Sequence, residues 1–492
     1  MRTWWNRNGL IFQTLALLML CSWQSLEAQQ PTHEDYLRMQ QRLAEQEARL
    51  RQLETVRLPP VDANPVFTNS AFERRISSLE GMVGDTNGLK PANNKPTQKW
   101  SGRVHFDYWG FPRVDDLPNS FDPGSSATGP PDFFGFRRLR IGVQGDITDT
   151  MLYKLEMEFA APSDVTFKDA YLGWDELPLL HTVLLGNQKR PYGLDTLNSS
   201  RYNVFMERPL HVEAFNQDAR RMGLQSFGLS DEQSWNWRFG YFLMDDLSKT
   251  GFQRTDHYQS EFAGRLANTI WYDETSGGRG YAHWAVSGSA AFPGGGPDAR
   301  FRTRPEGRTS TAWYDTDEIA GGQRYQLFGV EGVVNVGAFQ VVGEYQTANV
   351  QRSVGSDLNF GGGYVYVAYF LTGEHTPWSR KSGTLGRVKP FENFFLVRQC
   401  EGSRGRGLGA WQVAARYTHG DFSDDNIFGG VGDTFTFGMN WWWTPYSRMQ
   451  FNYIHGSMSQ RAEALTGNPL PGSGGNTSGD YQMFGARFMV DF

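Results

Sequence analysis

The sequence has little cysteine and, beyond its first 24 residues, no long apolar run. Cys21 and Cys400 are the only cysteines in 492 residues, so disulfides do not stabilise the chain. No later segment approaches the ~20 apolar residues of a membrane-spanning helix, which excludes a helical membrane protein. Aromatic residues nonetheless make up 14% of the chain, and 56 residues are glycine. Such abundant aromatics argue against a disordered chain and favour strands whose two faces meet different solvents.

Residues 1–28 are typical of an export signal, with a short basic region followed by an apolar stretch. Leu18-Met19-Leu20 precedes Cys21 without the small residues expected before a lipid-bearing cysteine, which argues against a lipoprotein. Cleavage after Ala28 would remove two arginines and one glutamate from 47 basic and 53 acidic residues, leaving 45 and 52 and a net charge of −7. An acidic mature chain argues against a nucleic-acid partner.

A region with helical periodicity follows the signal. Residues 29–58 carry apolar side chains at alternating steps of three and four, with Glu and Arg between them. They include Met39, Leu43, Leu50 and Leu53. This spacing is typical of a coiled-coil seam, which packs either on its own chain or on partner helices. The polar, proline-containing flank favours self-association, and residues 59–99 predict a short helix and a polar linker.

From residue 100 onward the hydrophobic period is two. In VHFDYWG, Val104, Phe106 and Tyr108 alternate with polar residues, and the alternation recurs in RLRIGVQ, LYKLEMEF, AFQVVGEYQ and TFTFGMNW. In a soluble sandwich the apolar rows would form a core, whereas in a membrane barrel they face lipid and the polar rows line a wet lumen. About sixteen such segments begin near residues 100, 133, 151, 165, 181, 219, 235, 258, 281, 324, 338, 363, 408, 433, 446 and 481.

This even number favours an all-β fold, a transmembrane antiparallel β-barrel of about 16 strands over residues 100–492. Short turns and long loops also alternate, as in outer-membrane barrels. The short turns include Asp146–Asp149, Asn335–Gly337 and Thr444-Pro445, and the long loops include Pro112–Asp132, Pro293–Gly322 and Ser457–Asp480. Glu374–Arg406 breaks the pattern because it is long, basic and on the short-turn side. It is either an insertion at that end or a register error of one strand pair.

The chain ends on Phe492, in a strand where Phe484, Phe488 and Val490 share its face. A terminal aromatic residue on an alternating strand predicts recognition by the outer-membrane assembly machinery.

Residues 133–228 contain, in order, FRRLRIGVQGDIT, YKLEMEFA, VTFKDAYLGW, LLGNQKRPYGLDTLNSS, FMERPL and DARRMGLQ. With this spacing they resemble the porin O and P family, the phosphate-selective porins of Gram-negative outer membranes. The resemblance extends more weakly through LTGE, RVKPF and residues 409–417 to the C-terminus, so it covers residues 100–492. It implies an outer-membrane location in a Gram-negative bacterium and a homotrimer of sixteen-stranded barrels, each with a third outer loop folded into the pore.

The strand count places this third outer loop at Pro191–Asp218. In phosphate-selective members, arginines and a lysine near the constriction replace the water around the anion with charge-assisted hydrogen bonds. The corresponding basic residues here are Lys189, Arg190, Arg208, Arg220 and Arg221, with Arg138 and Arg140 on the second strand and Arg201 in the loop. The resemblance implies passive diffusion of small anions or polar solutes, with phosphate or polyphosphate among the candidates.

Other interpretations of these charges stay open. The bases at 137–140 also fit a solvated lumen face, and ion pairs of Glu207 with Arg208 or of Asp218 with Arg220 would brace the loop. Inward carboxylates would partly offset the bases; these are Asp107, Glu156, Glu158 and Glu344. A second class of function is a structural envelope protein that tethers the outer membrane through its coiled coil. No His, Cys or Ser grouping has the spacing of a metal or catalytic site, so we expect no cofactor, metal or enzyme.

The loop position also predicts which charges control ion selectivity. Exchanging Arg190 and Arg208 together for Glu is expected to move the reversal potential towards cation preference. The same exchange at Arg304 and Arg308, in a long outer loop away from the matching motifs, is expected to change little.

Overall fold

The computed structural model describes residues 96–122, 129–161, 163–216, 219–248, 259–293, 299–398, 404–461 and 473–492. The predicted signal peptide, the coiled coil with Met39, Leu43, Leu50 and Leu53, and nearly all of the linker lie outside these residues.

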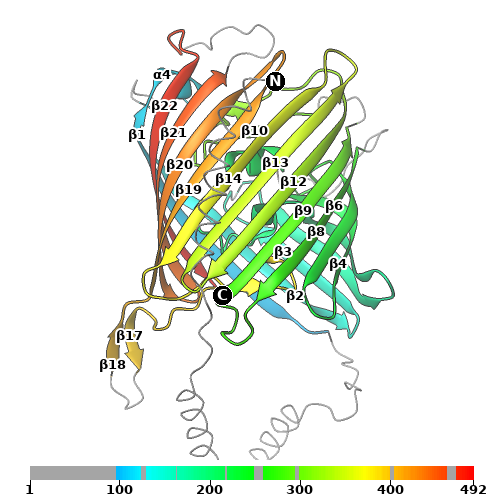
Figure 1. Ribbon diagram of the computed structural model, residues 1–492, viewed down its shortest axis with the longest axis vertical. Coiled ribbons are helices and arrows are strands. Elements are labelled where there is room, and N and C mark those ends of the chain that lie inside the picture. Colours follow the sequence, from blue (N-terminus) through cyan, green and yellow to red (C-terminus); the bar gives the residue numbers. More distant parts are fainter. Residues whose placement is uncertain are drawn as a thin grey trace, which may run out of the picture. The chain divides into compact units, whose positions relative to one another are not determined.

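Sixteen strands close into one antiparallel barrel, in which β22 pairs with β1 (Figure 1). The strands are β1 (Lys99–Val114), β2 (Phe133–Thr148), β3 (Met151–Glu158), β4 (Thr166–Leu177), β5 (His181–Lys189), β6 (Arg220–Leu229), β7 (Trp235–Leu243), β8 (Ser260–Tyr272), β9 (Gly280–Phe292), β12 (Gly322–Val336), β13 (Phe339–Arg352), β14 (Leu358–Phe370), β19 (Ala410–Asp424), β20 (Ile427–Thr444), β21 (Ser447–Arg461) and β22 (Ser478–Asp491). Closure gives the backbone of every strand a partner on both sides, as a lipid environment requires. The predicted all-β barrel is confirmed.

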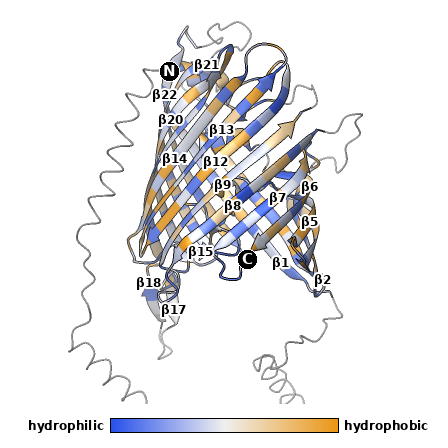
Figure 2. Cartoon of the chain, turned by 45° about the vertical axis from the view of Figure 1, so that its right-hand side comes forward, coloured by the Kyte–Doolittle hydropathy of each residue, from blue (hydrophilic) through white to orange (hydrophobic). Residues whose placement is uncertain are grey.

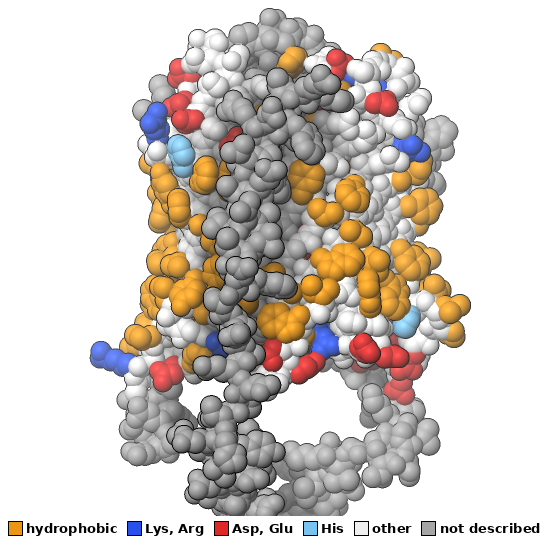
Figure 3. All heavy atoms as spheres, viewed as in Figure 1, with side chains coloured by type: hydrophobic (Ala, Val, Ile, Leu, Met, Phe, Trp, Pro, Cys, Tyr) orange, Lys and Arg blue, Asp and Glu red, His pale blue; other side chains and the backbone are white. Residues whose placement is uncertain are grey.

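Hydrophobic and hydrophilic residues alternate along the strands (Figure 2). In β12, Phe328, Val330 and Val334 are exposed, whereas Leu327 and Glu331 are buried. On the face seen in Figure 3, apolar side chains gather in a band with charged side chains at its margins. An apolar band outside and a polar, packed interior are the arrangement that a bilayer imposes on a barrel.

The three described helices are short: α4 (Asp116–Phe121), α5 (Leu194–Leu197) and α6 (Leu210–Phe215). Among the residues that the structure describes, no helix is long and apolar enough to cross a membrane.

Residues 371–409, here called the inner insertion, join β14 to β19 at the short-turn end. The predicted strand register is therefore right, and the long segment there is an insertion. It contains two hairpins, β15 (Trp378–Ser379) with β16 (Thr384–Leu385) and β17 (Phe395–Arg398) with β18 (Arg404–Gly407). The second hairpin extends beyond the barrel, at the end where the C-terminus lies (Figure 1).

The first hairpin of the inner insertion packs inside the barrel. The Trp378 ring stacks on Tyr281 of β9, with 5.4 Å between the ring centroids. Arg265 of β8 donates a hydrogen bond to the Gly383 carbonyl at 3.0 Å. The inner insertion therefore fills part of the lumen from the short-turn end.

Residues 190–219, here called loop 3, join β5 to β6 and carry α5 and α6. Loop 3 crosses to the opposite wall, where the Val204 carbonyl accepts hydrogen bonds from Asn440 of β20 at 3.0 Å and Gln450 of β21 at 3.1 Å. Most of its apolar side chains are buried, Leu194 and Leu210 completely. The predicted third outer loop therefore folds into the barrel.

An inward-facing glycine gives loop 3 its space on the opposite wall. A Cβ atom at Gly362 of β14 would lie 2.5 Å from the His211 Cβ, closer than real Cβ atoms approach. Any larger residue at position 362 therefore displaces α6 or the strand.

We expect Gly362→Ala to lower the free energy of unfolding by about 1–3 kcal/mol, because it overpacks this contact. The measurement is the temperature at which the folded band of the protein disappears in semi-native gel electrophoresis. Gly332→Ala on β12 is the matched control, since the nearest atom to its added Cβ lies 4.0 Å away. Equal transition temperatures for the two variants would contradict the packing of loop 3 against β14.

Candidate functional site

A cavity of about 640 Å³ lies between loop 3 and the wall formed by β1 to β5. Charged side chains dominate its lining, with twelve basic residues against seven acidic ones. The basic residues are Arg103, Arg137, Arg138, Arg140, Lys154, Lys168, Lys189, Arg201, Arg208, Arg220, Arg304 and Arg308. The acidic residues are Glu158, Asp164, Asp169, Glu207, Glu213, Asp246 and Glu306. The lining therefore has an excess of positive charge.

The carboxylates of the β3 and β4 wall are occupied by ion pairs. Glu158 lies 2.6 Å from Arg140, and Glu156, just behind the lining, pairs with Arg103 at 2.7 Å and Arg140 at 3.1 Å. Asp169 pairs with both Arg220 and Lys154 at 2.5 Å. These carboxylates hold the basic side chains in position and, being paired, do not cancel the charge of the remaining bases.

Glu207 fixes loop 3 to the barrel wall. Its carboxylate accepts two hydrogen bonds from Arg137 of β2, at 2.8 and 2.9 Å, and one from Arg487 of β22 at 2.8 Å. Burial alone would raise the pKa of Glu207, but Arg137 and then Arg487 hold that pKa well below its usual range. The brace expected from Glu207 therefore exists, with Arg137 and Arg487 as partners in place of Arg208.

Lys189 also anchors loop 3. Its ammonium donates hydrogen bonds to the carbonyls of Thr196, Leu197 and Asn198 at 2.8 to 2.9 Å. A lysine ammonium has three protons, so all of its donors are used by the loop. Lys189 contributes charge to the cavity while its hydrogen bonds support α5.

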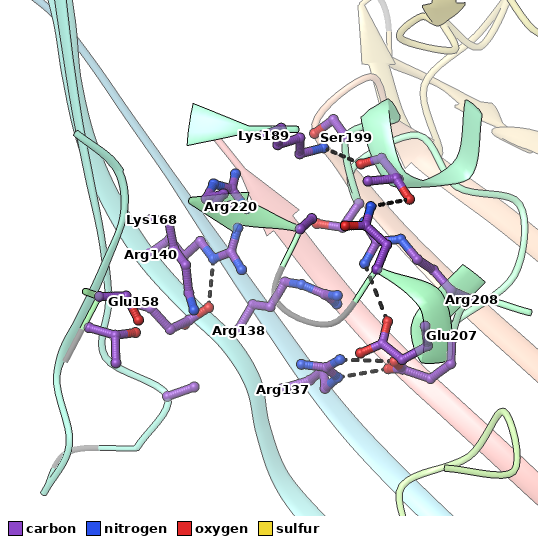
Figure 4. Close-up of a pocket in the computed structure, with 18 of the residues that line it drawn as sticks. Arg137, Arg138, Arg140, Glu158, Lys168, Lys189, Ser199, Glu207, Arg208 and Arg220 are labelled. Carbon is purple, nitrogen blue, oxygen red and sulfur yellow. Dashed lines mark hydrogen bonds and ion pairs between the residues drawn. The ribbon is translucent and has the colours of Figure 1, made fainter. Parts of the chain in front are cut away.

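Two of the cavity arginines, Arg138 and Arg308, have neither a carboxylate partner nor a hydrogen bond to a carbonyl among the described residues. Figure 4 shows Arg138 extending from β2 into the space between the wall and loop 3. Among the described residues its one polar contact is a 3.5 Å approach of Nη1 to the His105 Nδ1 atom. Arg308 lies over the Phe133 ring, 5.9 Å from its centroid. Within the described part of the chain, neither guanidinium forms an ion pair.

Six of the eight basic residues expected at the constriction line the cavity: Lys189, Arg201, Arg208, Arg220, Arg138 and Arg140. Arg190 and Arg221 do not. Arg190 is buried against β8, where it pairs with Glu261 at 2.7 Å and donates to Asn216 at 2.7 Å. Arg221 donates to the Met244 carbonyl at 2.6 Å. The expected ion pair between Asp218 and Arg220 stays a prediction, because Asp218 lies outside the described residues.

The expectation that Arg304 and Arg308 lie far from the site is wrong, because both line the cavity. Their loop (293–321), with β10 (Arg302–Thr303) and β11 (Tyr314–Asp315), folds inward. Its Glu306 is buried and pairs with Arg416 of β19 at 2.7 Å. Burial, with repulsion from Arg137 and Arg304, lowers the pKa of Arg308 to about 10. No sequence motif marks this inward fold.

Arg103, Lys154 and Lys168 are further cavity residues absent from the expected set. Arg103 and Lys154 belong to inward polar rows, so the alternation already indicated where they face. The alternation did not indicate that Arg103 and Lys154 line one cavity together with residues of loop 3. Among the residues described, no group of three or more His, Cys, Asp or Glu side chains is placed to hold a metal ion.

Comparison with known proteins gives three further findings. The family described as phosphate-selective porin O and P matches residues 100–492. An uncharacterized protein of Caulobacter vibrioides is 26% identical over 369 residues, which cover 72% of this chain and 68% of that protein. Porin O of Pseudomonas aeruginosa is 27% identical over 139 residues, so the match spans 26% of this chain and under a third, 29%, of that relative.

Among solved structures, an anion-selective porin from Comamonas acidovorans aligns with a TM-score of 0.47 at 13% identity. The alignment covers 81% of this chain and 100% of the porin.

We expect Glu207→Gln to lower the free energy of unfolding by about 3 kcal/mol, because it removes the counter-charge of the partly buried Arg137 and one of the two acidic partners of the buried Arg487. Thermal unfolding in detergent, followed by circular dichroism, measures the change. Glu213→Gln is the control: Glu213 is 46% exposed, and its 3.8 Å pair with Arg208 should be worth well under 1 kcal/mol.

The same contact has a pH dependence of defined sign. The folded-state pKa of Glu207 is depressed, so its stabilisation is fully present above the unfolded value of about 4.3 and is lost as pH falls through the folded pKa. The Glu207→Gln variant should therefore lose less stability than the wild type below about pH 4. If the stability of the two proteins falls in parallel as the pH is lowered, Glu207 does not stabilise the fold through its ionised carboxylate.

Proposed function

The chain belongs to the phosphate-selective porin O and P family, and from that membership we propose that small anions diffuse through its barrel between loop 3 and strands β1 to β5. The family and the closed barrel make the chain an outer-membrane channel of a Gram-negative bacterium rather than an enzyme. The proposal concerns what the channel passes and by which side chains.

The observation that carries the proposal is the positive excess in the 640 Å³ cavity, where twelve basic residues face seven acidic ones. A cleft with low-dielectric walls focuses such charge on a passing ion. Charges elsewhere on the protein are screened within a Debye length of about 8 Å at physiological salt. The cavity charges therefore outweigh the net negative charge of the whole chain in selecting the ion.

Arg138 and Arg308 are the proposed anion-binding groups. Neither forms an ion pair within the described residues, so their N–H groups are available to replace the water around an anion. A guanidinium also matches the geometry of an oxyanion, which extends the proposal to phosphate and polyphosphate. Arg201, Arg208, Arg220 and Arg140 contribute charge from side chains that carboxylates or carbonyls already hold.

The alternative function is a structural envelope protein that tethers the outer membrane through the coiled coil. That segment lies outside the described residues, and the cavity favours the channel. Planar-bilayer recording separates the two, since a barrel with a purely structural role gives no conductance steps. We also propose contact of the apolar band with outer-membrane lipid and recognition of Phe492, 65% exposed at the end of β22, by the assembly machinery.

We expect the double variant Arg138→Gln/Arg308→Gln to lower the anion-to-cation permeability ratio by on the order of tenfold, the low end of the enrichment that a focused field produces. Phosphate should also lose any block of the chloride current. The reversal potential in a KCl gradient across a planar bilayer measures the first effect, and titration with phosphate measures the second.

Arg113→Gln is the control for this variant, because Arg113 is 63% exposed and lies outside the cavity lining. It should leave the reversal potential unchanged. A folded double variant with the wild-type reversal potential would exclude the anion pathway along loop 3.

We further propose a homotrimer that the coiled coil at residues 29–58 strengthens, since seam residues such as Met39 and Leu50 bury against partner helices. Deleting residues 29–60 should lower the temperature at which the oligomer dissociates on a native gel, while the barrel stays folded. An unchanged dissociation temperature would assign the segment a different partner.

A further inference from the structure

A second, smaller pocket lies at the short-turn end of the barrel, between loop 3 and the inner insertion. Its volume is about 10 Å³, which holds one species the size of a water molecule. The residues that define it are Arg201, Tyr202, Arg387, Trp442, Arg448 and Asp491. Arg201 and Tyr202 also line the large cavity, so the small pocket lies next to that cavity, towards the short-turn end of the barrel.

The charges around this pocket do not balance. Three guanidinium groups line it, and Asp491 is its one carboxylate. Arg387 donates hydrogen bonds to Asp491, and the Arg201 Nε lies 3.0 Å from an Asp491 oxygen. Two of these three pocket-lining arginines thus share the carboxylate, and the third, Arg448, has no acidic partner among the described residues.

Arg448 is buried, and two of its N–H donor groups have no hydrogen-bond partner among the described residues. Its residue is 1% exposed, yet its Nε and Nη1 atoms have no hydrogen-bond partner among the described residues. It alone of the described arginines has two such buried nitrogens. Its remaining contacts are weak. Nη2 lies 3.7 Å from the Met489 sulfur, and the guanidinium carbon lies 5.0 Å from the centroid of the Trp442 ring. A buried, unpaired guanidinium is costly, and an anion within reach of both donors would remove most of that cost.

We propose that this pocket binds a single halide ion, chloride in a physiological setting, through the Nε–H and Nη1–H groups of Arg448. Arg387 and Arg201 supply the further positive charge, and Asp491 keeps those two side chains in place. A volume with room for about one small species favours a monatomic anion over a tetrahedral oxyanion such as phosphate. This site is distinct from the proposed pathway of anion diffusion. A halide ion can bind there without any ion passing through the channel.

Anomalous diffraction tests the site directly on the full-length wild-type protein. Crystals grown in sodium bromide should show a bromide peak within hydrogen-bonding distance of the Arg448 Nε and Nη1 atoms. Absence of a peak in this pocket, with the side chain as described, would overturn the proposal.

Halide-dependent stability tests the site in solution. Replacing gluconate, which is too large for the pocket, by chloride at constant ionic strength should raise the thermal unfolding midpoint of the wild type and saturate. Arg448→Gln should abolish this rise, and Arg113→Gln, at the exposed rim, should retain it. An equal chloride response in the wild type and Arg448→Gln would count against the site.

Arg448→Lys provides a second variant in case the glutamine variant does not fold. It keeps the positive charge but lacks the two-donor fork, so it should fold and lose the chloride response. The outcome does not depend on the permeability experiment, since Arg138 and Arg308 lie outside the small pocket. Failure of one proposal therefore leaves the other testable.

Discussion

Arg487 connects the closing seam of the barrel to the loop that narrows it. Its guanidinium donates two hydrogen bonds of 2.7 Å to Asp107 on β1, across the seam between the first and last strands. It donates a third, of 2.8 Å, to Glu207 in loop 3. Because Arg487 and Asp107 are buried, removing either one leaves an uncompensated charge inside the barrel. Closure of the barrel and placement of loop 3 therefore depend on the same network.

The cavity is positive in a chain whose net charge is −6, and the ion pairs explain how. Glu156 and Asp169 each bind more than one basic partner, so few carboxylates hold many bases against one wall. Within the described residues, Arg138 and Arg308 line the same cavity without a carboxylate partner. The sign of the site thus follows from how charges are paired in three dimensions, and net charge is a poor guide to it.

Two segments enter the lumen from opposite ends and meet. Loop 3 comes from the long-loop end and the inner insertion from the short-turn end, and the Leu385 N–H donates to the Asn198 side chain at 3.0 Å. Together they fill the lumen beside β8 and β9. The large cavity remains on the other side of loop 3, against β1 to β5. The small pocket lies next to it, at Arg387 of the inner insertion.

The sequence by itself determined the barrel, its sixteen strands and which residues face inward, because a strand repeats every two residues and lipid selects one apolar row. The predicted strand starts were least accurate at β14 and β20, near residues 363 and 433 in place of 358 and 427, since glycines there interrupt the alternation. The third outer loop followed from the strand count and the matching motifs.

Only the tertiary structure decided how the charges are used. Lys189 and Arg190 are adjacent in the sequence, yet the first lines the cavity and the second is buried against β8. Arg308 reaches the same cavity from a loop more than a hundred residues away from Lys189. Among the described residues Arg448 has no acidic partner, whereas its neighbours Arg201 and Arg387 share Asp491. A period of two specifies the face of a strand but carries no information on where a loop folds inside the lumen. That position depends on ion pairs and close packing between residues far apart in the chain.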